Sequence, residues 1–166
     1  MSLIADKATF QSSLATLPVV TYQPGEAVIV DGSRSGRLLI LSKGTVAIVK
    51  DGTEIAKVAE TGAVFGELSV LLDQPHTADV RALETSQFQV ANAATLLTQN
   101  PIAVLYIATM LARRLDGANQ ALIQLKNQLL TGEPQSEVAK TVSKMEGLLV
   151  ASASLVYAGY PHDPFT

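Results

Sequence analysis

The chain has 166 residues, of which 48% are hydrophobic, and a formal net charge of −3. This length and apolar content are typical of one globular domain with an appendage, and they exclude a disordered chain. The acidic balance disfavours a nucleic-acid-binding protein, which normally has a cationic surface, and the absence of cysteine excludes disulfides and thiolate chemistry and fits a reducing compartment.

A short amphipathic helix is predicted at residues 4–15, where Ile4, Phe10 and Leu14 recur at helical spacing and Pro18 follows. The charged residues Asp6 and Lys7 interrupt this N-terminus, which lacks the apolar segment of a signal peptide. No apolar run in the sequence reaches membrane-spanning length. We therefore expect a cytoplasmic protein that does not enter a membrane.

Residues 18–93 are predicted to form short β-strands, each followed by a turn. Two strands stop at Gly32 and Gly44, and Asp51-Gly52 separates two apolar runs, which is the strongest short-range signal of a β-hairpin. Apolar residues alternate later in this segment, at Ala78, Val80, Ala82, Phe88 and Val90. The predicted fold class is therefore α+β: an antiparallel, jelly-roll-like β-roll flanked by an N-terminal helix and long C-terminal helices.

The pattern becomes helical after residue 94. A brief helix over AATLLTQN precedes Pro101, a favoured first helical residue, and a long helix over about 102–130. Its apolar residues follow one another at alternating steps of four and three, as in the seam of a coiled coil: Val104, Ala108, Leu111, Leu115, Ala118, Leu122, Leu125 and Leu129. We expect the first half of this seam to pack on the β-roll and Leu122–Leu129 to pair with a second copy. The protein is thus predicted to be a homodimer, with Leu111, Leu115, Leu122, Leu125 and Leu129 in the interface.

Gly117 interrupts the long helix and is read as either a hinge or a place of close helix approach. The sequence GEP at 132–134 ends this helix. One more amphipathic helix is expected through Val138, Val142, Met145 and Leu149, with Ser136 as its candidate cap. The proline-rich tail is expected to be irregular.

Several segments together resemble the cyclic nucleotide-binding domain of catabolite activator-type regulators, protein kinase A regulatory subunits and nucleotide-gated channels. They are YQPGEAVIVDG, LLILSKGTVAIV, G-x-x-FGELSVL, P-x-x-ADVRAL and LARRL, which cover about residues 5–130. The specific part is Phe65-Gly66-Glu67-Leu68 with Pro75 and Ala78-Asp79-Val80 at the right distance. The resemblance implies a domain over residues 1–130 and a helical extension with an irregular tail over 131–166.

In that family this stretch is the phosphate-binding cassette. The resemblance implies that Gly66 lets backbone N–H groups approach a phosphate, that Glu67 accepts a hydrogen bond from the ribose 2′-hydroxyl, and that Thr77 donates to the phosphate. Leu68 and Leu71 are expected to point inward. The implied ligand is cyclic AMP or cyclic GMP, without a metal or other cofactor. The implied ligand-binding residues are Phe65, Gly66, Glu67, Leu68, His76, Thr77 and Ala78.

His76 stands where the family has an arginine. Arginine is always charged and binds two oxygens, whereas histidine near neutral pH is mostly neutral with one donor, so the loss could weaken binding by about ten- to a hundred-fold. One reading makes His76 a phosphate contact, in which case binding strengthens as pH falls. The other makes it an exposed loop residue, with Arg34 or Arg37 as the alternative source of the cation.

The lid over the base is expected in the stretch after LARRL, which here reads DGANQ. Ala118 cannot hydrogen-bond a base, so Asn119 and Arg114 are the lid candidates. Arg113 and Arg114 are read in the first place as surface residues beside the coiled-coil seam.

No nucleophile arrangement is recognisable, so we expect no enzyme, and His162-Asp163 makes a poor dyad or metal site. One predicted helix without a basic face follows Leu130, so no DNA-binding domain and no direct nucleic-acid binding are expected. The leading hypothesis is a homodimeric cyclic nucleotide sensor whose ligand repositions the long helix for a protein effector. The alternative is a degenerate roll that serves as a dimerisation or scaffold module. The sensor predicts thermal stabilisation by cyclic AMP or cyclic GMP that Glu67→Ala abolishes; the scaffold predicts no shift.

Overall fold

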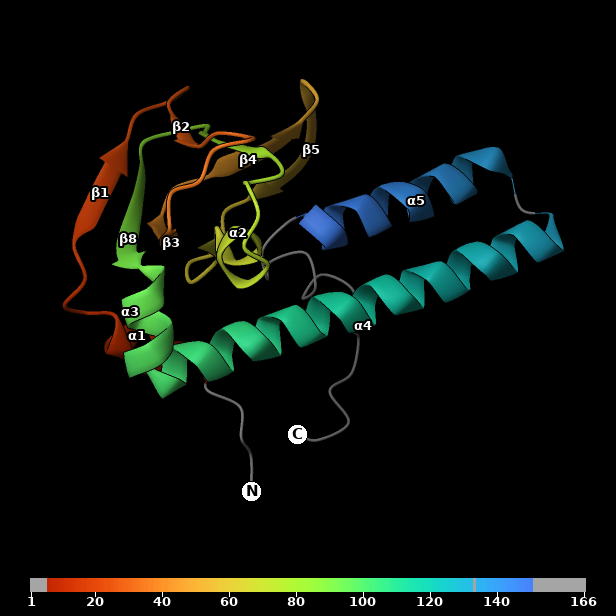
Figure 1. Cartoon of the computed structure of the whole chain (residues 1–166). Helices are drawn as coiled ribbons and strands as arrows, with labels where there is room; N and C mark the ends of the chain where they lie inside the picture. The colour runs from red at the N-terminus through yellow and green to blue at the C-terminus, as the bar shows by residue number, and fades with distance from the viewer. Residues whose placement is uncertain (1–5, 133, 151–166) are drawn as a thin grey trace.

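The computed structural model describes residues 6–132 and 134–150, with side chains up to residue 145. In this part of the chain eight strands form two four-stranded antiparallel sheets (Figure 1), in the orders β1-β8-β3-β6 and β2-β7-β4-β5. The strands are β1 (Val19–Tyr22), β2 (Ala27–Ile29), β3 (Arg37–Lys43), β4 (Val46–Lys50), β5 (Thr53–Val58), β6 (Val64–Phe65), β7 (Asp79–Ala82) and β8 (Ser86–Asn92). The helices are α1 (Lys7–Ser13), α2 (Glu67–Leu71), α3 (Ala93–Gln99), α4 (Pro101–Thr131) and α5 (Gln135–Val150).

The predicted fold class is confirmed, and local sequence explains its turns. Asp51 and Gly52 join β4 to β5 with φ angles of 49° and 76°. Positive φ at both central residues is what a type I′ hairpin turn requires. The predicted hairpin is therefore present where Asp-Gly stands in the sequence.

Strand β3 divides the interior into two cores, because successive side chains of a strand point to opposite faces. Leu39 and Leu41 pack between the two sheets, in what we call the inner core. Leu38 and Ile40 pack against α1, α3 and α4, in what we call the helical core. Each residue of β3 can thus be assigned to one core by its position in the strand.

The first half of α4 covers the helical core with residues other than those predicted. The buried side chains are Ala103, Ile107 and Met110, whereas Val104 and Ala108 are exposed. The first half of α4 does pack on the helical core, but its buried stripe lies one position away from the predicted seam, of which Leu111 still packs against this core. Both sets have helical spacing, and the contacts with α1 and α3 decide between them.

Helix α3 meets α4 at a break where their axes differ by 103°. Asn100 caps α4 by accepting a hydrogen bond from the backbone N–H of Ala103, and Pro101 is the first helical residue, as predicted. No single described helix is long and apolar enough to cross a membrane; only the bent pair α3–α4 meets that criterion, by length and composition.

Helix α5 turns back and lies along the second half of α4 (Figure 1). Ala118 and Ala121 are buried in this part of α4, and the helix continues through Gly117 without a break. The hinge reading of Gly117 thus finds no support in this backbone. Ser136 lies inside α5, not before it, so its predicted capping role is wrong. Ile4, the Leu149 side chain and His162-Asp163 lie outside the described residues.

Candidate functional site

The inner core opens at one end into a hollow between the roll and α2. Strands β2, β4, β6 and β7 contribute to its wall, together with the first turn of α2 and the segment before β7. Its lining consists of Ile29, Ile48, Val64, Phe65, Gly66, Glu67, Leu68, Ser69, His76, Thr77, Ala78 and Val80. All seven residues that the sequence singled out as ligand-binding are therefore brought together here.

Gly66 occupies a position that tolerates no side chain. Its φ is +92°, and a Cβ built on it would lie 2.7 Å from the carbonyl oxygen of Arg37. That distance is below van der Waals contact, and the obstacle is backbone, which cannot rotate away. Glycine is thus required for the close approach of β3 to the start of α2.

Glu67 and Arg114 form an ion pair at the wall of the hollow, with 2.6 Å between Oε1 and Nη1. Both residues are 5% exposed, so the pair is shielded from solvent. It joins the first residue of α2 to the middle of α4. The sequence reading of Arg114 as a surface residue is wrong, because Arg114 continues the buried stripe of α4 four residues after Met110. Arg113 is exposed, as expected.

His76 is 6% exposed, so its reading as an exposed loop residue is wrong. Its backbone N–H donates to the carbonyl of Ser33 over 2.9 Å, and its carbonyl accepts from the N–H of Gly32 over 2.8 Å. On the ring, Nε2 lies 3.1 Å from the Ser35 hydroxyl. Every one of these contacts goes to the segment between β2 and β3, so His76 holds that segment against the hollow.

Burial lowers the pKa of His76 below its usual 6.5, although the nearby Glu67 carboxylate opposes the shift. The unfolded chain therefore binds a proton at pH values where the folded protein does not, and the free energy of unfolding should fall as pH drops below about 6.5. Above that pH, this histidine contributes no pH dependence.

We expect His76→Gln to remove this part of the pH dependence. The measurement is urea unfolding at pH 7.5 and 5.5 for both proteins, where the native chain should lose more stability on acidification than the variant. An equal loss in the two proteins would contradict the burial effect.

Residues 19–99 match the family model of the cyclic nucleotide-binding domain. The chain contains a domain of this family. Among curated proteins, potassium/sodium hyperpolarization-activated cyclic nucleotide-gated channel 4 of Oryctolagus cuniculus is 27% identical over 145 residues, which are 86% of this chain and 12% of the channel. The chain thus spans a small part of that relative.

Two solved structures support the fold of this cyclic nucleotide-binding domain. A cyclic nucleotide-binding domain from Methylobacillus flagellatus has a TM-score of 0.54 at 24% identity, covering 70% of this chain and 71% of that one. A structure of PKAR CBD2 with Sp-2Cl-cAMPS bound has a TM-score of 0.52 at 20% identity, covering 76% and 80%.

Two other predicted residues of the cyclic nucleotide-binding domain lie away from the hollow. Asn119, a lid candidate, is exposed on α4 and does not line the hollow. Leu71 is exposed at the end of α2, so the prediction that it points inward is wrong; Leu68 lines the hollow. Leu71 is the last residue of this five-residue helix, and the α2 residues that line the hollow end at Ser69.

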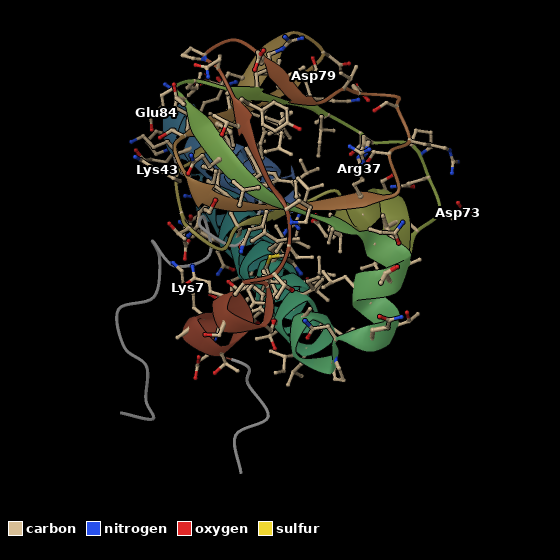
Figure 2. The ribbon with its side chains drawn as sticks, turned by 90° about the vertical axis from the view of Figure 1, so that its left-hand side faces the viewer. Lys7, Arg37, Lys43, Asp73, Asp79 and Glu84 are labelled. Carbon is tan, nitrogen blue, oxygen red and sulfur yellow. The ribbon has the colours of Figure 1, made fainter. Side chains whose placement is uncertain are left out.

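Arg34, one of the two alternative sources of a cation, is engaged elsewhere. Its guanidinium donates to the Asp73 carboxylate over 3.0 Å and to the Asp73 carbonyl over 3.2 Å. Figure 2 shows Arg37, the other candidate, on the same side of the roll as Asp73. Among the described residues, Asp73 thus pairs with Arg34 and not with Arg37.

Proposed function

We propose that the protein is a regulatory sensor that binds cyclic AMP or cyclic GMP in the hollow and transmits binding through α4. The observation that carries this proposal is the buried Glu67–Arg114 pair, because it links a residue of the hollow to the long helix. The family match of residues 19–99 supports the class of ligand.

Glu67 can serve ligand and helix together. A carboxylate has about four lone-pair sites, so Glu67 can accept a hydrogen bond from a ribose hydroxyl while it pairs with Arg114. A ligand that engages the carboxylate changes the strength and direction of its bond to Arg114. This change acts on α4 at Arg114. That residue follows the part of α4 that packs on the helical core and precedes the part that packs on α5.

The ligand proposal is tested by thermal unfolding with each cyclic nucleotide. A ligand at a hundred times its Kd adds about 2.7 kcal/mol to the free energy of unfolding, which corresponds to a rise in Tm of roughly 5–10 °C for a chain of this size. We expect such a rise for the native protein and a much smaller one for Glu67→Gln, which keeps the shape but loses the charge. Equal shifts in both proteins would argue against the role of Glu67.

We further propose that the protein forms a homodimer through α4 and signals to a protein effector. Leu115, Leu122 and Leu129 are spaced by seven residues and are 63%, 53% and 64% exposed. Between Gly117 and Thr131 the only charged residue is Lys126, so each copy brings a single charge to this segment. The predicted interface residues Leu111 and Leu125 are half-buried at the edges of this face.

Replacing both Leu122 and Leu129 by lysine should convert the dimer to a monomer, because it places like charges in the seam. Sedimentation velocity measures the change. Val142→Lys, which places a lysine at an exposed apolar residue of α5, is the control and should stay dimeric. A native protein that sediments as a monomer would exclude this part of the proposal.

The second candidate function is a scaffold that has given up nucleotide binding. His76, buried and held by the 32–35 segment, favours this candidate, because the lining of the hollow contains no cation among the described residues. We also propose that the protein binds a ligand without catalysing a reaction, because the matched family is named for binding. A cytoplasmic location remains part of the proposal.

A further inference from the structure

A cyclic phosphate carries a negative charge, and the described lining of the hollow contains no lysine or arginine to balance it. Its one charged lining residue is Glu67, whose charge Arg114 balances. An anion that enters a site without a compensating positive charge loses its hydration at a large cost in free energy. If the proposed function holds, a cation must therefore reach the ligand from outside the lining.

Most basic residues of the surrounding strands and loops are already paired within the described chain. Arg34 pairs with Asp73, Arg81 with Asp79, and Lys50 with Asp31. For Arg37, by contrast, no ion pair is formed within the described residues, and its side chain is exposed. Its guanidinium is thus free of the acids that hold the other cations.

Strand β3 places Arg37 on the side of the hollow. Leu39 and Leu41, two and four residues further on, point into the inner core, so the alternation of the strand assigns Arg37 to the same face. Leu39 pairs with Phe65 in the neighbouring β6, which brings Arg37 beside the start of α2. The close approach of the Arg37 carbonyl to Gly66 shows that the two segments touch there.

His76 holds the segment that leads into Arg37, and it is not itself the cation that meets the phosphate. Its ring nitrogen contacts the Ser35 hydroxyl, and the same hydroxyl oxygen accepts the backbone N–H of Arg37 over 3.3 Å. Together with the two backbone hydrogen bonds of His76, these contacts fix the segment 32–35 and the residue that follows it into β3.

We propose that Arg37 is the residue that binds the phosphate of the cyclic nucleotide, and that His76 is a positioning residue that holds the loop from which Arg37 emerges. In this arrangement the positive charge that binds the phosphate comes from β3 and not from the cassette. The ligand of the hollow is still a ribonucleoside cyclic phosphate. This inference rests on the proposed nucleotide binding.

The test is calorimetric titration of cyclic AMP into the native protein, Arg37→Gln, Arg37→Lys and the matched control Arg34→Gln. We expect a loss of affinity of about ten- to a hundred-fold in Arg37→Gln, part of it regained in Arg37→Lys, and less than about two-fold in Arg34→Gln. Arg37 is exposed, so thermal unfolding without ligand should be unchanged in its variants.

Native affinity in Arg37→Gln would overturn the inference and leave the proposed function standing, as would equal losses in Arg37→Gln and Arg34→Gln. Absence of binding of cyclic AMP and cyclic GMP by the native protein would overturn the proposed function and this inference with it.

A double-mutant cycle tests the role of His76. If His76 positions Arg37, His76→Ala should weaken cyclic AMP binding in the native protein but have little further effect in the Arg37→Gln background. Losses that add in the double variant would show that His76 acts on the ligand independently, which would overturn the positioning role.

Discussion

Replacing Arg114 by methionine is expected to lower the free energy of unfolding by about 3–5 kcal/mol, because it leaves the Glu67 carboxylate buried without its cation. Both members of the pair are removed from solvent, with 2.6 Å between their charged atoms. The methionine keeps most of the aliphatic volume, so the loss reports on charge and hydrogen bonding more than on packing. Urea unfolding at pH 7 measures it.

Arg113→Met is the matched control, since Arg113 is the neighbouring arginine of the same helix and is exposed. It should change the free energy of unfolding by less than about 0.5 kcal/mol. The double variant Glu67→Gln/Arg114→Met should regain part of the stability lost in Arg114→Met, because no unpaired charge remains buried. Equal effects of Arg113→Met and Arg114→Met would contradict the assignment of a buried pair.

Gly66→Ala is expected to destabilise the protein and to abolish nucleotide binding. A non-glycine residue at φ +92° costs about 1–2 kcal/mol in backbone strain. The added methyl group must also displace the Arg37 carbonyl, which opens the contact between β3 and α2 on which the hollow depends. Urea unfolding and calorimetric titration of cyclic AMP measure the two effects.

Gly25→Ala separates strain from obstruction. Gly25 has a φ of +86°, but no atom lies within 4 Å of its added Cβ. The control should therefore show the backbone strain alone and leave nucleotide affinity unchanged. If Gly66→Ala were no more harmful than Gly25→Ala in either measurement, the close approach at Gly66 would have no functional weight.

The β-roll could be predicted from sequence because its signals are local. Asp51-Gly52 can form the required turn by itself. The alternation through Ala78, Val80 and Ala82 defines the buried face of β7 and of the residue just before it. The cassette was recognisable for a related reason: Phe65-Gly66-Glu67 is a contiguous motif, and the structure brings it together with His76 at the hollow. The division of the chain at residue 130 remains a prediction.

Two of the errors, at Arg114 and at His76, concern contacts between segments far apart in the sequence. The coiled-coil spacing selects Leu111 and Leu115 and so predicts Arg114 at the surface, whereas the buried stripe of α4 lies one position away. Only the orientation of α4 against the roll decides between the two stripes. The reading of His76 as an exposed residue is wrong because its three hydrogen-bond contacts lie in a segment more than forty residues earlier, which no local pattern reveals. Its contact with a ligand stays a prediction.

Contacts with distant segments also distinguish the two residues that could replace the arginine that the family has at position 76. From sequence, Arg34 and Arg37 are equivalent substitutes, since both lie in the turn segment GSRSGR. Their environments differ because Asp73 holds the first, whereas the alternation of β3 directs the second to the inner core's open end.

Nucleotide binding by this protein is tested most directly by calorimetric titration of cyclic AMP and of cyclic GMP into the native protein near pH 7. We expect saturable binding of at least one of them, with one nucleotide per chain and with affinity lost in Gly66→Ala. No heat from either nucleotide in a folded native protein, at concentrations up to the millimolar range, would contradict it and leave the dimerisation or scaffold function.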